Sequence, residues 1–207
     1  MTGKAKLEQL FATPFFSVQL AEVHSLNQAL VRDVLELSST TPSTVQSNVG
    51  GWQSSKSLQD SPVQSFAELI AIINDAVMQF FSIATDGKIL ASPKQIRLWA
   101  NVNRAGDFNG PHYHAGAVLS GVYYPEGGQS DAGPADVGTL ILKDPSRSSV
   151  IASALPLPDP LRSIFPHQIV IEPAASLLVL FPSWLEHWVA PHTSGKPRIS
   201  LAFDVIY

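Results

Sequence analysis

The chain contains no cysteine, and this absence excludes several kinds of site at once. Disulfides, zinc–thiolate sites, iron–sulfur clusters and cysteine nucleophiles all require that side chain. Charge is also scarce, since Lys, Arg, Asp and Glu make up only 14% of the 207 residues and no run of Lys or Arg occurs. Binding to a phosphate backbone needs clustered positive charge, so a nucleic acid is not expected as a partner.

Long apolar runs are missing as well. No stretch approaches the roughly 18 consecutive apolar residues of a membrane-spanning helix. The first 16 residues carry several charges and no apolar core of signal-peptide length. We therefore expect no membrane association and a cytoplasmic location. Because 45% of the residues are hydrophobic, the chain can form one well-filled core, and we expect residues 1–207 to be a single domain.

The N-terminal part, residues 1–90, has the pattern of helices. Apolar residues recur at three- and four-residue spacing over residues 23–37 and again over 66–81, which predicts two amphipathic helices. Between them, residues 38–57 are rich in Ser, Thr, Pro and Gly, which predicts a loop.

The remainder, residues 91–207, has the pattern of strands, because short apolar and β-branched runs alternate with Gly, Pro, Asp and Ser. We expect strands near residues 95–103, 117–124, 138–142, 168–172, 176–181, 187–190 and 198–207. Short strands preceded by two helices predict a mainly β (α+β) fold, a β-sandwich or double-stranded β-helix (jelly roll) with the N-terminal helices packed on one sheet.

Three histidines are candidate metal ligands. His112 and His114 are separated by one residue at a predicted strand start, and residues two apart in a strand point to the same face. His187 begins another predicted strand and completes the set. On pattern alone His167 or His192 can replace His187, although we expect both at the surface, and any of these side chains can also be a hydrogen-bonded structural histidine.

Arg198 is a candidate anion-binding residue. It lies inside the apolar last strand, two residues before Ser200 and on the same face. Burial of an unpaired charge is costly, so an inward Arg198 needs an anion. Its planar guanidinium suits a carboxylate, and the Ser200 hydroxyl adds a further hydrogen bond. The alternatives are that Arg198 faces solvent or pairs with a protein carboxylate such as Asp204.

The blocks WANVNRAGDFNGPHYHAGAVLSGVYY, GTLILKDP, LFPSWLEHWVAP and KPRISLAFD, in this order across residues 99–207, form a composite pattern. It resembles the iron(II)/2-oxoglutarate oxygenase superfamily, and more specifically a bacterial and phage-encoded branch of it. The resemblance implies that His112 and His187 bind Fe(II), and that Arg198 with Ser200 holds the distal carboxylate of the cosubstrate 2-oxoglutarate.

The same resemblance implies further cosubstrate contacts. Tyr124 and Ser120 lie on the strand after the first histidines, and Asn101 and Asn103 lie on the strand before them. For Tyr124 and Ser120, ordinary packing within a strand is an equal alternative.

One position departs from the superfamily pattern, because His114 stands where its members carry Asp or Glu. Three neutral imidazoles leave Fe(II) with its full formal charge of +2. The HxH form is similar to that of the branch, but Asp107 can also take the place of His114, and three histidines also suit zinc.

The function implied by the resemblance is an oxygenase that hydroxylates a small molecule or a protein side chain, with O2 as co-reactant. Segments 50–52 and 126–138 are candidate lids, and a homodimer is a candidate assembly. Two alternatives remain. One is a keto-acid-independent three-histidine dioxygenase or hydrolase of the cupin type, and the other is a non-enzymatic jelly-roll binding module.

Overall fold

The computed structural model describes residues 6, 11–88, 92–128, 138–146, 154, 158 and 166–207. Its helices are α1 (His24–Thr40), the short 3-10 helix η1 (Leu58–Asp60) and α2 (Gln64–Ala84). Its strands are β1 (Phe16–Gln19), β2 (Asn48–Val49), β3 (Trp52–Gln53), β4 (Gln95–Asn103), β5 (Phe108–His112), β6 (Leu119–Tyr124), β7 (Leu140–Lys143), β8 (Gln168–Ile171), β9 (Leu177–Pro182), β10 (His187–Val189) and β11 (Arg198–Ile206).

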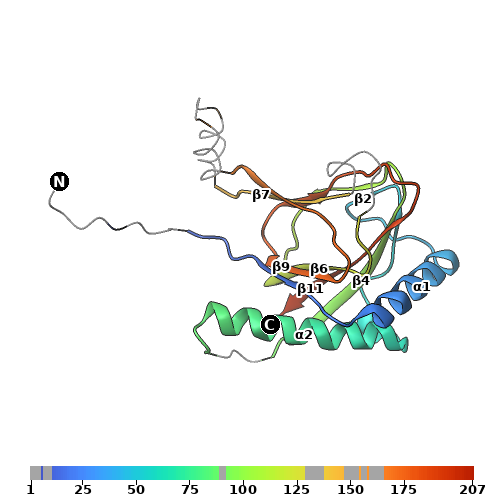
Figure 1. The fold of residues 1–207 in the computed structure, drawn as a ribbon, viewed down its shortest axis with the longest axis horizontal. Helices are drawn as coiled ribbons and strands as arrows, with labels where there is room; N and C mark the ends of the chain where they lie inside the picture. Colours follow the sequence, from blue (N-terminus) through green and yellow to red (C-terminus); the bar gives the residue numbers. More distant parts are fainter. Residues whose placement is uncertain are drawn as a thin grey trace.

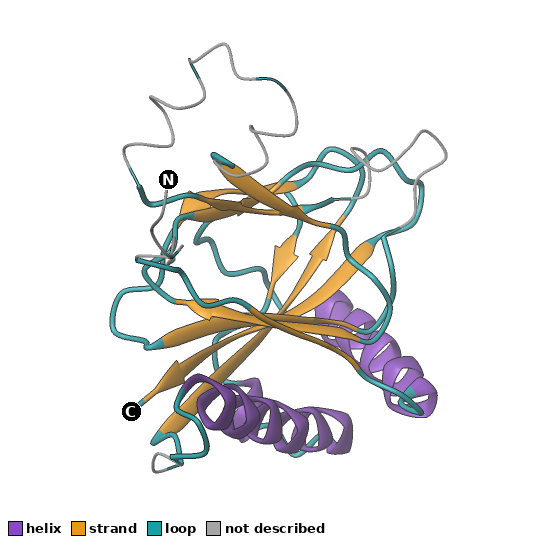
Figure 2. Ribbon diagram, turned by 60° about the vertical axis from the view of Figure 1, so that its left-hand side comes forward, coloured by secondary structure: helices purple, strands orange, loops and turns teal. Residues whose placement is uncertain are grey.

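The described strands form two sheets that face each other, and helices α1 and α2 lie on the outer side of one of them (Figures 1 and 2). The larger sheet has the order β1-β9-β6-β11-β4-β3, and the smaller sheet has the order β2-β5-β10-β7-β8. Strands that are distant in sequence are therefore neighbours in space, and the space between the sheets is enclosed by residues from both halves of the chain.

The alternation of side chains along β11 separates two environments. The odd-numbered positions 199–205 are apolar and join the core cluster beneath the helices. The even-numbered positions 198–204 line a cavity between the two sheets. Because successive side chains of a strand point to opposite faces, the same nine-residue strand both anchors the helices and supplies polar groups to the interior.

Helix α2 is held by one apolar stripe, in which Phe66, Leu69, Ile73 and Val77 are almost completely buried. By length and composition alone α2 would be sufficient to cross a membrane. Its stripe, however, packs in the same core cluster as the outer face of the larger sheet. The apolar character of α2 is thus explained by its role as a core helix.

The predicted fold is confirmed: the chain is mainly β, with a jelly roll of two antiparallel sheets and the N-terminal helices on one of them. Three predictions of local structure were wrong. The N-terminal part is not only helical, since β1 pairs with β9. The polar segment 38–57 is not only a loop, since its β2 and β3 pair with β5 and β4. His112 ends a strand, β5, that was not predicted, and His114 follows it without being in a strand. Most of the candidate lid 126–138 lies outside the described residues.

Candidate active site

His112, His114 and His187 converge at the inner side of the smaller sheet. His187 at the start of β10 is the register partner of His112 at the end of β5. His114 is held by its backbone N–H, which donates to the carbonyl oxygen of Ser183 at 2.8 Å. One nitrogen from each ring lies within 4.8 Å of the others, which is a spacing that one metal ion can bridge.

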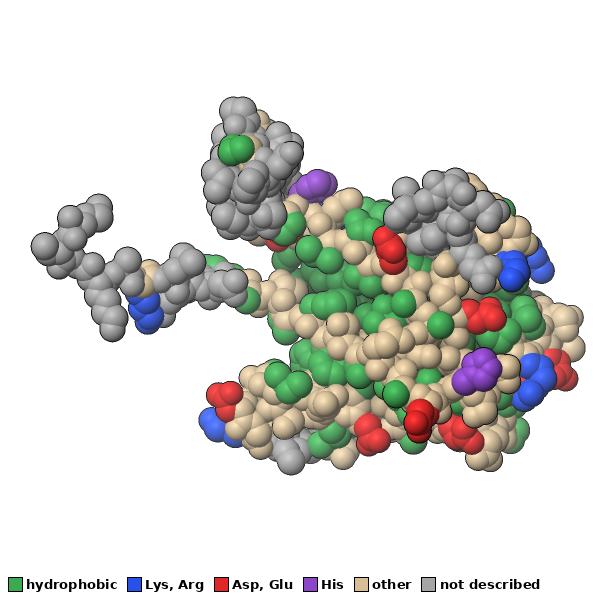
Figure 3. Space-filling model, in the orientation of Figure 1, with side chains coloured by type: hydrophobic (Ala, Val, Ile, Leu, Met, Phe, Trp, Pro, Cys, Tyr) green, Lys and Arg blue, Asp and Glu red, His purple; other side chains and the backbone are tan. Residues whose placement is uncertain are grey.

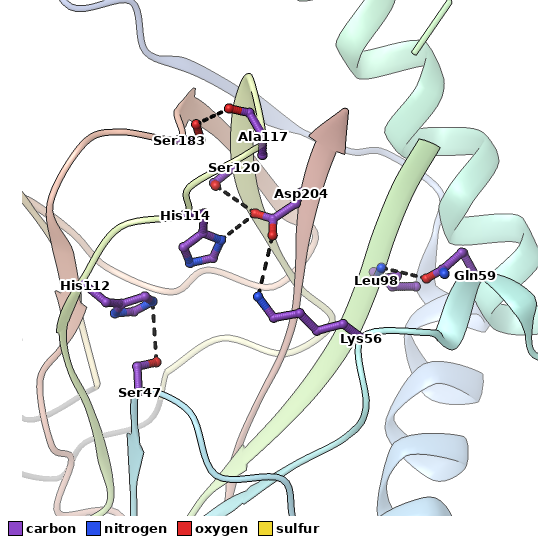
Figure 4. A network of polar contacts seen from close by, with 10 residues as sticks. All are labelled: Ser47, Lys56, Gln59, Leu98, His112, His114, Ala117, Ser120, Ser183 and Asp204. Carbon is purple, nitrogen blue, oxygen red and sulfur yellow. Dashed lines mark hydrogen bonds and ion pairs between the residues drawn. The ribbon is translucent and has the colours of Figure 1, made fainter. Parts of the chain in front are cut away.

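The second nitrogen of each ring is already engaged. The Nδ1–H of His112 donates to the carbonyl oxygen of Gly110 at 2.7 Å, and that of His187 donates to the carbonyl oxygen of Leu185 at 2.8 Å. His114 Nδ1 is bonded to the carboxylate of Asp204. Because carbonyl and carboxylate oxygens only accept, Nδ1 carries the proton and Nε2 of each ring has its lone pair available for a cation. In the structure, the Ser47 hydroxyl lies 3.4 Å from Nε2 of His112 (Figure 4).

Burial keeps the imidazoles of His112 and His187 in the form that binds metals. It lowers the pKa of His187 from 6.5 to about 3, and the neighbouring His112 acts in the same direction. Burial also lowers the pKa of His112. Both rings are thus neutral near pH 7, as a metal ligand must be.

Asp204 is a site residue that the sequence did not reveal, since it was considered only as an alternative partner of Arg198. In the structure it is 4% exposed and contacts His114 instead (Figure 4). Ser120 donates to its Oδ1 at 2.9 Å, and Lys56 Nζ lies 3.6 Å from its Oδ2. Burial alone would raise the pKa of Asp204, but the hydrogen bond and charge of His114, the charge of Lys56 and the Ser120 hydroxyl together hold it below its ordinary value. The even-number spacing from Arg198 along β11 was the signal that places Asp204 in the same cavity.

Arg198 points into the same space and is 7% exposed. Its two terminal nitrogens donate to the Ser200 hydroxyl at 3.1 Å and to the Tyr124 hydroxyl at 3.4 Å, while Nε has no partner. Among the described residues no carboxylate forms an ion pair with it. Burial lowers the pKa of Arg198, yet a guanidinium remains protonated in proteins. A buried positive charge without a counter-ion is costly, so this pocket fits an anionic ligand.

The histidines and the arginine line one cavity of about 580 Å³, which is within the range of small-ligand pockets. Of the predicted cosubstrate contacts, Arg198, Ser200, Tyr124, Asn101 and Ser120 also line it, whereas Asn103 does not. The Oδ1 atoms of Asn101 and Asn103 are buried without a hydrogen-bond partner. Together the residues present fit a metal ion at one end and a carboxylate at the other.

The alternative ligands occupy other places. His192, which we expected at the surface, is 2% exposed, and its Nε2–H donates to the carbonyl oxygen of Asn103 at 2.9 Å. His167 is exposed. The Asp107 carboxylate accepts a hydrogen bond from the Arg104 backbone N–H at 2.7 Å. Within the described part of the chain, the only group with metal-ligand spacing is the three-histidine cluster.

Fold and site therefore define a jelly-roll protein in which a three-histidine cluster with metal-ligand spacing and a buried arginine line one cavity. A model of the family described as "Putative 2OG-Fe(II) oxygenase" matches residues 97–204. The chain belongs to this family, and it is thus a non-haem iron dioxygenase whose cofactors are Fe(II) and 2-oxoglutarate. No curated protein matches the sequence.

Solved structures share the fold at low sequence identity. A prolyl-4-hydroxylase from Pseudomonas putida is 16% identical, with a TM-score of 0.65 and coverage of 95% of this chain and 94% of that one. A prolyl hydroxylase from Trichoplax adhaerens, solved with a hypoxia inducible factor peptide fragment, is 15% identical, with a TM-score of 0.63 and coverage of 96% and 86%. HygX from Streptomyces hygroscopicus, with nickel and 2-oxoglutarate bound, is 14% identical, with a TM-score of 0.59 and coverage of 92% and 82%.

Proposed function

We propose that the chain is a hydroxylase in which His112, His114 and His187 hold Fe(II). Arg198, with the Ser200 and Tyr124 hydroxyls, binds the distal carboxylate of 2-oxoglutarate. The observation that carries this assignment is the buried Arg198 guanidinium, which has no acidic partner among the described residues and shares one cavity with the histidines. A bidentate contact to a carboxylate would neutralise the charge of Arg198 and give its remaining N–H groups an acceptor.

The protein's part is to bind, orient and exclude water. When bound, Fe(II) and 2-oxoglutarate supply the oxidising power to insert one atom of O2 into a C–H bond, while 2-oxoglutarate is converted to succinate and CO2. Arg198 fixes the far end of the keto acid, which limits the orientations that its near end can take. The apolar lining residues Val122, Leu140 and Phe181 keep the interior poor in water.

Two features support a small molecule or a protein side chain as the primary substrate. The protein has a net charge of −4. On the face shown in Figure 3, the described basic side chains are scattered among acidic ones and do not form a cluster. A nucleic-acid substrate would favour a basic stripe beside the cavity.

A keto-acid-independent three-histidine enzyme is the main alternative. Such an enzyme would not need an anion beside the metal, and the Arg198 charge would then stay buried without compensation. For this reason we favour the keto acid.

The test is a pair of measurements on the wild type and on Arg198→Ala. Isothermal titration calorimetry of 2-oxoglutarate into Ni(II)-substituted protein measures binding, and succinate formation by the Fe(II) protein in air measures turnover. We expect Arg198→Ala to weaken 2-oxoglutarate binding at least tenfold and Arg198→Lys to have an intermediate effect. Arg32→Ala removes an exposed arginine on α1 and serves as the control. Unchanged binding in Arg198→Ala would disprove the assigned anchor, and metal binding without any 2-oxoglutarate binding in the wild type would favour the alternative enzyme class.

A further inference from the structure

The three histidines are not held in the same way. His112 and His187 donate their Nδ1–H to backbone carbonyl oxygens, which are neutral acceptors. His114 alone is bonded to a carboxylate, that of Asp204. The side chain of Asp204 comes from β11 in the larger sheet and points toward His114, as Figure 4 shows.

We propose that Asp204 is the positioning residue of the metal centre. It holds the His114 ring with Nε2 directed at the cation, and it supplies the negative charge that three neutral imidazoles lack. This inference rests on the proposed metal site. Asp204 acts through His114 and is not itself a ligand, because Oδ1 is shared by His114 and Ser120, and Oδ2 faces Lys56.

The charge balance of the cavity supports this role. Among the described residues that line it, the cationic side chains are Lys56, Arg97 and Arg198, and Asp204 is the only carboxylate. A divalent cation bound there by neutral rings would face an excess of positive charge among buried and partly buried side chains. One carboxylate behind one ligand is the only compensation that these residues provide, and a carboxylate behind an imidazole increases its basicity as a metal ligand.

The surroundings of Asp204 fix its direction. Ser120 on β6 donates to it from one neighbouring strand. On the other side, Lys56 Nζ lies 4.2 Å from the Trp99 ring centroid, and the Trp99 ring on β4 also packs against His114 with centroids 5.5 Å apart. Asp204, Lys56 and His114 therefore form one packed group. The His114 ring is held by its bond to Asp204 and by its packing against Trp99, so it has little freedom to rotate away from the metal.

The test compares Asp204→Asn with a matched control, Asp33→Asn. Asp33 on α1 is also a partly buried carboxylate with a hydroxyl donor, Ser65, and a cationic partner, Arg32, but it lies outside the cavity. Co(II) is titrated into each metal-free protein by calorimetry, and circular dichroism checks that each variant is folded. We expect Asp204→Asn to weaken Co(II) binding by roughly 10- to 100-fold, the range found for changes behind metal-binding histidines. Asp33→Asn should bind like the wild type.

A second measurement is made first on the wild type, where its result does not depend on how any variant folds. Long-range ¹H–¹⁵N spectra of the Zn(II)-loaded protein report which nitrogen of His114 carries the proton, and we expect Nδ1. In folded Asp204→Ala we expect this proton signal to weaken or to divide between two ring states.

The outcomes separate this inference from the metal site itself. If the wild type binds no Co(II), the proposed centre is wrong. If the wild type binds Co(II) and Asp204→Asn binds it within threefold as tightly, the centre stands and the role of Asp204 is refuted. A His114 ring that carries its proton on Nε2 in the wild type would also overturn this role.

Discussion

His112 at the end of β5 lies directly opposite His187 at the start of β10 in the register of the smaller sheet, with ring centroids 4.3 Å apart. The pairing of two strands, and not a flexible loop, thus sets the distance between these two candidate ligands. Sites built on paired strands are held more rigidly than sites on loops, which suits a metal centre.

The first prediction separates a ligand from a structural histidine. His187→Ala removes one of three candidate ligands and should weaken Co(II) binding at least 100-fold. His192→Ala removes the buried hydrogen bond to the Asn103 carbonyl instead. It should lower the free energy of unfolding by about 1–3 kcal/mol with little change in Co(II) affinity. Calorimetry and urea denaturation give the two quantities, and equal Co(II) affinities in the two variants would contradict the assignment.

The second prediction concerns acid stability of the metal-free protein. The pKa of His187 is lowered to about 3 in the folded state, while the unfolded chain protonates this ring near 6.5. The contribution of this ring to the free energy of unfolding is therefore fully present above pH 6.5. It is lost as the pH falls from 6.5 towards 3, because the unfolded chain then binds a proton that the folded chain does not. The pKa of His112 is also lowered, so it acts in the same direction.

We expect urea denaturation to give a free energy of unfolding roughly 2–4 kcal/mol smaller at pH 4 than at pH 7. His187→Leu should show a shallower dependence, because the titrating ring is gone. A wild-type protein that is equally stable at both pH values would contradict the burial of neutral imidazoles.

The third prediction concerns the space behind Arg198. Gly138 has a φ of +70°, and a Cβ added there would lie 2.6 Å from Cδ of Arg198. Gly138→Ala should therefore displace the guanidinium and weaken 2-oxoglutarate binding several-fold. Gly106, with a φ of +86° and nothing within 4 Å of an added Cβ, carries the same backbone cost without the contact.

Gly106→Ala should accordingly lower stability by about 1 kcal/mol and leave 2-oxoglutarate binding unchanged. Thermal denaturation and calorimetry measure the two effects. If both glycine variants bind 2-oxoglutarate like the wild type, the position of Arg198 does not depend on Gly138.

The fourth prediction uses two adjacent tyrosines that face opposite sides of β6. Tyr124 lies over the Arg198 guanidinium and accepts its hydrogen bond, whereas the Tyr123 hydroxyl donates to Asn27 on α1. Tyr124→Phe should weaken 2-oxoglutarate binding by a few-fold. Tyr123→Phe should lower the free energy of unfolding by about 1 kcal/mol and leave that binding unchanged. If Tyr123→Phe weakened 2-oxoglutarate binding and Tyr124→Phe did not, the cosubstrate would lie on the helix side of the sheet, which would contradict the proposed pocket.

The sequence alone was sufficient for the elements that have a strong periodicity. The apolar stripe of α2 and the alternation along β11 predicted the helices and the last strand, because packing against a core demands those repeats. It also indicated the candidate histidines and Arg198. A histidine pair at this spacing is compatible with a structural role as well, but few roles explain an arginine inside an apolar strand. The short strands β1, β2, β3 and β5 were not predicted, because two to five residues are too few to show a clear period.

Only the tertiary structure decided which side chains meet. The sequence offered Asp204 only as an alternative partner of Arg198, but in the folded chain it contacts His114, and β11 pairs with β6 so that Asp204 lies opposite Ser120. His192 was expected at the surface, but the fold buries it and its ring bonds to the Asn103 carbonyl. Partner choice depends on which distant strands are neighbours, and local sequence does not specify that pairing. Its physical source is the joint burial of apolar faces from the whole chain.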